Sequence, residues 1–278
     1  MNPIALLEVI KPKQTLLLMI TFLVSFLVAG GREEIFLCFI ATFLTISGTT
    51  ALNMFLDRDI DALMMRTRKR PIPAGELSPR ACAIYGSTLF SFGFLIALMI
   101  KFEFAFILLL GFIFDILVYT LLLKRKSPYS IILGGVAGAM PALAGWVAVK
   151  GFTLPGFLIS ALVFLWIPSH IWFIAMHYEE DYRKAKIPMY PLVAGIRKAS
   201  WVIVFTTSSM LLLIIALYFL IPLSFFYLFI AIPAILIFLF KAIKFAIAPK
   251  KEKAREMYKL ASLKLGAIFL GLLFGAFL

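Results

Sequence analysis

The chain has 278 residues, of which 63% are hydrophobic, and its mean hydropathy is +1.04. Since a soluble domain averages roughly half apolar residues, this composition excludes an ordinary soluble domain and indicates a polytopic membrane protein. The formal charge of +13 taken alone is compatible with nucleic-acid binding, and the placement of the charges along the chain decides against it.

Nine apolar runs in chain order are candidates to cross a bilayer, which takes about 20 residues of helix. We expect these spans near Leu16–Ala29, Ile35–Leu52, Ala83–Ile100, Phe104–Leu123, Ile131–Val149, Leu154–Met176, Trp201–Leu220, Leu223–Phe240 and Tyr258–Leu278. The prediction is an all-α polytopic membrane protein, with nine transmembrane helices around one cavity open to the cytoplasmic side and the membrane. We expect residues 1–278 to form a single transmembrane domain.

Positive charge is distributed unevenly between the loops. All but four of the 27 lysines and arginines lie on alternate loops, the exceptions being Arg32, Lys101, Lys150 and Lys264. Because basic loops stay in the cytoplasm, this predicts a cytoplasmic N-terminus and an external C-terminus in the cell membrane. The excess charge then reflects topology and attraction to the lipid bilayer, and no nucleic-acid partner is expected.

The loop after the second span carries the first group of acids, in "LNMFLDRDIDALMMRTRKRP" at 52–71. Asn53, Asp57 and Asp61 are spaced four apart and share one helix face, whereas Asp59 points the other way. One amide and two carboxylates on a face suit Mg²⁺, which takes oxygen ligands and often substrate phosphates as well. The alternative interpretation is a solvated helix end.

Cations and a second acidic loop extend this pattern on the same predicted side of the membrane. Arg66 and Arg70 follow the first acids and are suited to gripping phosphate. After the sixth span, "HYEEDYRKAKIPMYPL" at 177–192 places Glu180 and Asp181 before Lys184. Two acid clusters at one cavity are what a diphosphate bridged by metal requires, and in an apolar bundle its simplest carrier is an isoprenyl diphosphate.

Four stretches give the chain a specific resemblance to a known family. They are "NMFLDRDIDALMMRTRKRP" at 53–71, "VYTLLLKRKSPY" at 118–129, "GGVAGAMPALAGW" at 134–146 and "DYRKAKIPMYPLV" at 181–193. The chain resembles the UbiA-type intramembrane prenyltransferases, and within them most closely the branch that farnesylates protoheme IX to give heme O. The resemblance covers roughly residues 50–195.

The resemblance implies roles for individual residues. The metal ligands for Mg²⁺ would be Asn53, Asp57, Asp61 and Asp181, of which the three aspartates are the expected catalytic residues. Arg66, Arg70 and Lys124 would bind the diphosphate, and we add Lys184 to this group. Tyr119 would line the cavity.

The acceptor side of the cavity is less specified by the sequence. His170 and His177 are two turns apart on one helix face and are candidates to contact heme, since a neutral imidazole ligates iron. Asp115 lies inside a predicted span, where an acid is a functional candidate, and we assign it with Glu180 to the cavity wall. The family places an acid where His177 stands in its other branches, which favours heme as the acceptor.

Other functions remain open at this point. A quinone precursor or an archaeal ether lipid, geranylgeranylglyceryl phosphate, would use the same chemistry with another acceptor. A transporter for an anionic lipid is a different class. An odd number of spans and chemistry confined to one face weigh against the transporter.

Overall fold

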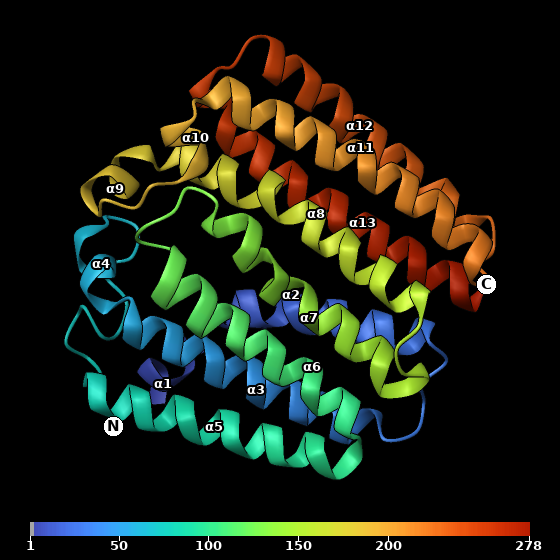
Figure 1. The fold of residues 1–278 in the computed structure, drawn as a ribbon, viewed down its shortest axis with the longest axis horizontal. Coiled ribbons are helices and arrows are strands. Elements are labelled where there is room, and N and C mark those ends of the chain that lie inside the picture. The colour runs from blue at the N-terminus through green and yellow to red at the C-terminus, as the bar shows by residue number, and fades with distance from the viewer. Residues whose placement is uncertain (1–2) are drawn as a thin grey trace.

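The structure of the protein is a computed structural model that describes residues 3–278. Its elements are α1 (Pro3–Val9), α2 (Pro12–Val28), α3 (Ile35–Leu56), α4 (Arg58–Leu63), α5 (Pro79–Ile100), α6 (Phe102–Phe112), the π-helix η1 (Ile113–Leu123), α7 (Ser130–Lys150), α8 (Leu154–His177), α9 (Glu179–Lys184), α10 (Tyr190–Val193), α11 (Ile196–Leu220), α12 (Phe226–Ile247), the short 3₁₀ helix η2 (Lys251–Lys253) and α13 (Ala254–Phe277). Over this range the fold is entirely helical, as predicted (Figure 1).

The membrane spans agree with the sequence in number and order. Within residues 3–278, eight helices are long and apolar enough to cross a bilayer, and α1 with α2 gives a ninth, bent by 51° at the break. The first span was predicted to start at Leu16, but α2 starts at Pro12. Proline is favoured in the first turn of a helix because its missing amide would have no partner there.

The outer surface of the bundle is apolar. Met99, Phe205 and Phe219 are 87%, 71% and 78% exposed. Large exposed apolar surfaces of this kind are rare on soluble proteins and are expected where helices face lipid.

Glycine allows two helices of the bundle to approach closely, because it places no side chain between them. A Cβ on Gly48 of α3 would lie 2.5 Å from the carbonyl oxygen of Gly86 on α5, so small residues set this membrane-type packing.

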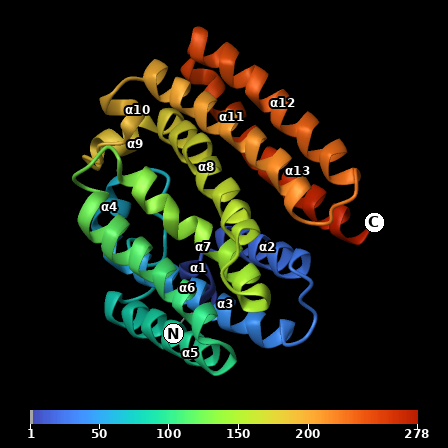
Figure 2. The same cartoon turned by 45° about the vertical axis from the view of Figure 1, so that its right-hand side comes forward.

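The helices do not contribute equally to the interior. Residues of α2, α3, α6 with η1, α7, α8 and α13 border one central cavity, whereas within the described chain α5, α11 and α12 supply none of its lining. The prediction of nine helices around the cavity is therefore corrected. Six helix positions, with α6 and η1 counted as one, surround the cavity, and the other three spans lie outside it. In the turned view, α11 and α12 lie on one flank of the bundle and α5 on the opposite side (Figure 2).

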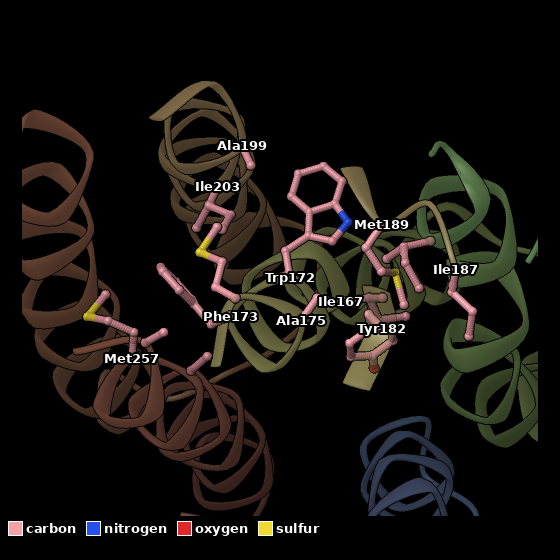
Figure 3. Packing of buried hydrophobic residues seen from close by; sticks show 14 of the residues in the cluster. Ile167, Trp172, Phe173, Ala175, Tyr182, Ile187, Met189, Ala199, Ile203 and Met257 are labelled. Carbon is pink, nitrogen blue, oxygen red and sulfur yellow. The ribbon is translucent and has the colours of Figure 1, made fainter. Parts of the chain in front are cut away.

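The two acidic loops come together at one end of the bundle, where α4 and α9 lie side by side in Figure 1. The second loop is held down by its own hydrophobic residues. Tyr182, Ile187 and Met189 join Trp172 of α8 in one buried cluster (Figure 3). The ring of Trp172 also stacks on Tyr190 with centroids 4.9 Å apart. This packing fixes the backbone that carries Asp181.

Candidate active site

A cavity of about 540 Å³ lies between the six helix positions. Its body is apolar, with Ile46, Leu108, Phe112, Val163 and Phe269 in its wall. One end is charged and is lined by Lys11, Asn53, Asp57, Asp61, Arg66, Arg70, Asp115, Tyr119 and Lys124. The cavity therefore combines an apolar chamber with an end suited to an anion.

The three polar residues predicted to share a helix face all line this charged end, and each already has a cationic partner. Lys124 Nζ donates to Asp57 Oδ2. Arg70 Nη1 donates to Asp61 Oδ2 at 2.5 Å, and Lys11 Nζ donates to Asn53 Oδ1 at 2.7 Å. Both aspartates and Asn53 are buried, and a carboxylate removed from water requires such partners.

Local helix geometry produces this row. α3 ends at Leu56 and α4 begins at Arg58, so that Asp57 caps the first helix and Asp61 lies one turn into the second. Asn53 is fixed from its other end, where Nδ2 donates to Thr120 Oγ1 at 2.9 Å. The side chains are therefore pre-positioned, with little rotamer freedom left to lose when a ligand binds.

One oxygen in this row has no partner. Asp57 Oδ1 is buried and receives no hydrogen bond from the residues that the structure describes. Buried polar atoms are nearly always satisfied, so an unsatisfied carboxylate oxygen on a residue that lines a cavity points to a ligand, an ion or water that completes it.

The π-helix η1 brings a second set of functional groups to the same end. Lys124 N donates to the carbonyl of Tyr119 at 2.8 Å, five residues back. In an α-helix, the nine residues from Asp115 to Lys124 make about two and a half turns and would place the two on opposite faces. The wider π turns place Asp115, Tyr119 and Lys124 together on the cavity wall, as π segments often do at functional sites.

The glycine-rich segment of α7 explains how Tyr119 is seated. A Cβ on Gly134 would lie 2.5 Å from the ring of Tyr119, so a larger residue there would displace the ring. Lys124 Nζ lies 5.4 Å from the centroid of the same ring. Glycine on α7 thus allows η1 to pack closely enough to present this pair.

Asp181 has a different environment from the other predicted metal ligands. Its two carboxylate oxygens accept the backbone amides of Met65 at 2.9 Å and Arg66 at 3.1 Å. It is 5% exposed and does not line the cavity. The prediction that the two acidic loops meet is correct, but Asp181 meets the backbone of the first loop, and so positions Arg66.

Three further predicted residues lie away from the cavity in this structure. Glu180 and Lys184 are exposed on α9, because the buried cluster turns the other face of that short helix inward. The ring of His177 lies against Tyr178 and Tyr258, with centroids 4.5 Å and 6.1 Å away. Their assignment to the diphosphate site and to the cavity wall is not supported by the geometry.

His170, in contrast, does line the cavity, on the side opposite α3. Its ring stacks on Trp166 with centroids 4.6 Å apart, and Nδ1 lies 3.1 Å from Ser262 Oγ of α13. Trp166 is itself anchored by a hydrogen bond from Nε1 to the carbonyl of Ala261 at 2.7 Å. The imidazole is therefore held in a fixed orientation toward the apolar chamber.

Asp59 points away from the row, as its position two residues from Asp57 and Asp61 on a helix predicts. It is paired with Arg125 at 2.6 Å on the surface, and the hydrogen bonds from Arg125 hold the pKa of Asp59 below its ordinary value. This aspartate belongs to a surface ion pair outside the cavity.

Sequence reasoning missed two contributors. Lys11 stands in the break between α1 and α2 with φ of 47°, and its position before Pro12 marks a helix start without showing its contact with Asn53. Thr120 bridges Asn53 Nδ2 and the carbonyl of Asp115. No sequence pattern identified η1 as a π-helix, and this bridge depends on that geometry.

These features define a helical membrane protein with a cavity for an amphiphilic ligand that has an anionic head and an apolar tail. Residues 17–264 match the UbiA prenyltransferase family, and the chain belongs to this family of prenyltransferases. The family inferred from the sequence motifs is thereby confirmed, and with it a multi-pass membrane protein.

Relatives and solved structures agree with this assignment. A protein of Archaeoglobus fulgidus named protoheme IX farnesyltransferase is 63% identical over 276 residues, 99% of this chain and 98% of the relative. One of Korarchaeum cryptofilum with the same name is 44% identical over 270 residues, 96% and 92% of the two chains. The structure of a digeranylgeranylglyceryl phosphate synthase, 20% identical, has a TM-score of 0.83 over 98% and 97%. A UbiA homologue from Archaeoglobus fulgidus bound to DMAPP and Mg²⁺, 15% identical, has a TM-score of 0.66 over 96% and 98%.

Proposed function

We propose that this chain transfers a farnesyl group from farnesyl diphosphate to protoheme IX, giving heme O, with Mg²⁺ as its cofactor. The observation that carries the proposal is the joining of a charged end and an apolar chamber in one cavity. The acceptor follows from relatives that share the name protoheme IX farnesyltransferase across nearly the whole chain. The structural neighbours support the fold and do not identify the acceptor.

The charged end fits Mg²⁺ and a diphosphate. Asn53, Asp57 and Asp61 would hold the metal, because they present oxygen donors to the cavity and Asp57 Oδ1 lacks a partner within residues 3–278. Each carboxylate oxygen of Asp181 keeps a second lone pair, so a metal contact there is compatible with its bonds to the backbone. When bound, Mg²⁺ supplies a Lewis acid for the leaving diphosphate.

The cations of this end would receive the diphosphate oxygens. Arg66, Arg70 and Lys124 line the cavity there, and guanidinium groups bind phosphate oxygens in pairs. As the bond between the farnesyl C1 and the diphosphate oxygen breaks, its electron pair moves to the diphosphate. Fixed cations stabilise that growing negative charge without reorganising.

The apolar chamber would hold the farnesyl chain and the acceptor. Its walls exclude water from the allylic cation while a vinyl group of the heme attacks C1. His170 is held by Trp166 and Ser262 toward this chamber, and its imidazole is the group in the wall suited to the heme iron. Water then adds to the cation left on the former vinyl group, giving a hydroxyethylfarnesyl substituent.

The orientation in the membrane is part of the same proposal. We place the charged end at the cytoplasmic side of the cell membrane, the N-terminus in the cytoplasm and the C-terminus outside. In a variant lacking Cys38 and Cys82, Arg32→Cys is expected to react with an impermeant thiol reagent added to intact cells. Arg68→Cys is expected to remain unlabelled until the cells are opened. The reverse pattern would overturn the orientation.

Product analysis tests the activity directly. Purified protein would be given farnesyl diphosphate and Mg²⁺ with heme b, with a quinone precursor, or with geranylgeranylglyceryl phosphate. The expected result is a farnesylated heme by mass spectrometry, together with released pyrophosphate, and no product in EDTA. Prenylation of only one of the other acceptors would overturn heme as the acceptor. Absence of pyrophosphate release with every acceptor would contradict the transferase activity itself.

A further inference from the structure

Asp115 is the one acidic residue of the cavity wall for which the proposed steps have no use. It lies in η1, inside the span Phe102–Leu123, and it lines the cavity. Its carboxylate makes no hydrogen bond or ion pair with any residue of the described range 3–278, and the side-chain hydrogen bond from Thr120 goes to its backbone carbonyl. An ionisable group inside a membrane span is expensive to keep and marks function by default.

The other four aspartates of the described chain all have partners. Asp57 and Asp61 are paired with Lys124 and Arg70, and Asp181 accepts two backbone amides. Asp59 is paired with Arg125 on the surface. Asp115 is thus the carboxylate of this group that can accept a proton without giving up an existing partner.

Prenyl transfer produces a proton that must be removed. With heme, farnesyl diphosphate, heme and water give the hydroxyethylfarnesyl heme, pyrophosphate and one proton. With an aromatic or alcohol acceptor, the proton comes from the carbon or oxygen that gains the prenyl group. In both cases the proton is released beside the new bond to C1.

The position of Asp115 matches that place. Along the cavity-facing side of α6 and η1, Tyr119 lies toward the charged end and Gly111 toward the apolar chamber, with Asp115 between them. Lys11, Lys124 and Asp57 are close enough to Asp115 to interact with it electrostatically. A farnesyl diphosphate with its head at the cations and its tail in the chamber has its C1 at this junction.

We propose that Asp115 is the general base of the transfer step. It accepts the proton that the acceptor loses or, with heme as the acceptor, the proton of the water that adds to the carbocation. The identity of the acceptor rests on the proposed function, but the need for a base does not. With heme, an oxygen–hydrogen bond of the incoming water breaks and its electron pair stays on the new hydroxyl oxygen. The proton goes to a carboxylate oxygen of Asp115 and later leaves to solvent.

The test separates diphosphate cleavage from transfer. Asp115→Asn keeps the size of the side chain and removes its basicity, and Asp59→Asn, outside the cavity, is the matched control. Three quantities would be measured with the acceptor that the wild-type protein prenylates. They are the affinity for farnesyl diphosphate, the slow hydrolysis to farnesol without acceptor, and the rate of transfer in a single turnover.

For Asp115→Asn we expect transfer to fall by about 100-fold or more, as for loss of a general base. Affinity for farnesyl diphosphate should stay within about twofold, so that the loss appears in the transfer step. In Asp115→Ala, added formate should restore part of the transfer rate in proportion to its concentration, because a small carboxylate replaces the missing base. Asp59→Asn should behave as the wild type.

Two results would overturn the proposal. Transfer by Asp115→Asn at a rate near that of the wild type would show that no base is needed there. A parallel loss of farnesyl diphosphate affinity and transfer, without rescue by formate, would show that Asp115 only maintains the structure of the cavity wall. Prenylation of an acceptor other than heme by the wild type would refute the proposed acceptor and leave this test in force.

Discussion

The two acidic loops carry the same kinds of residues and use them in opposite ways. In the first loop, Asp57 and Asp61 face the cavity and are paired with cations that line it. In the second loop, Asp181 turns toward protein backbone and holds Met65 and Arg66 in place. The first loop therefore presents charge to the cavity, whereas the second uses charge to fix the first.

The surroundings of each loop account for this difference. The first continues from α3 along the cavity, so its acids share the wall with Lys124 and Tyr119 of η1. The second is pulled down by the buried cluster around Trp172, which exposes Glu180 and directs Asp181 inward. An acid count alone assigns both loops the same role, and the hydrophobic residues between the acids separate them.

The largest effect is expected in the first loop. Asp57→Asn removes the carboxylate with the unsatisfied oxygen and leaves Lys124 without its anion, so turnover should fall by about 1,000-fold or more. Activity would be measured as prenylated product over a range of Mg²⁺ concentrations. Activity near the wild-type level at low Mg²⁺ would remove Asp57 from the metal site, provided that the purified variant elutes as the folded protein in detergent.

A smaller effect on activity, with a larger effect on stability, is expected in the second loop. Asp181→Ala leaves two partly buried backbone amides without their acceptor, at a cost of up to about 1–3 kcal/mol each. Its thermal midpoint in detergent should be clearly below that of the wild type, and activity should fall by about 10- to 100-fold, as for a supporting residue. If Asp181→Ala matches Asp57→Ala in activity and keeps wild-type stability, the contrast between the loops is wrong.

A smaller effect again, on substrate binding, is expected at Lys11, which joins the first loop from another part of the chain. Lys11→Met removes the hydrogen bond to Asn53 Oδ1 and one positive charge from the cavity end. The dissociation constant for farnesyl diphosphate should rise about tenfold, in line with the loss of one charged hydrogen bond. The control is Lys126→Met, at an exposed lysine outside the cavity. Equal binding by both variants would exclude Lys11 from the diphosphate site.

Much of this fold follows from the sequence. The nine spans and their order come from hydropathy, because each span depends on residues near one another in the chain. The meeting of the two acidic loops was inferred from topology, which places both loops on the same side of the membrane. The shared face of Asn53, Asp57 and Asp61 was predictable because a spacing of four positions keeps side chains together on a helix. The family resemblance supplied Lys124 and Tyr119.

The remaining parts depend on contacts between distant segments. The pairing of Lys11 with Asn53, and the use of both Asp181 oxygens by backbone amides, are fixed only when the helices pack. The π-helix is a further example, because α-helical spacing places Asp115 and Lys124 on opposite faces and their common wall requires the wider turns. Hydropathy likewise could not separate α5, α11 and α12 from the six helix positions that border the cavity.

The smallest effects are expected for acids of both loops that point away from the cavity. Asp59 is paired with Arg125 on the surface, and an exposed ion pair contributes about 0–1 kcal/mol to folding. Glu180 is exposed on α9 and does not line the cavity within the described residues. Asp59→Asn and Glu180→Gln should therefore keep turnover within about twofold of the wild type, because surface substitutions of this kind change stability by roughly 0.5 kcal/mol or less. Turnover by Glu180→Gln would be measured beside Asp57→Asn in the same assay. A large loss of turnover in Glu180→Gln would mean that the second loop turns its outer face toward the diphosphate during the reaction. The contrast between the loops would then hold only for the substrate-free protein.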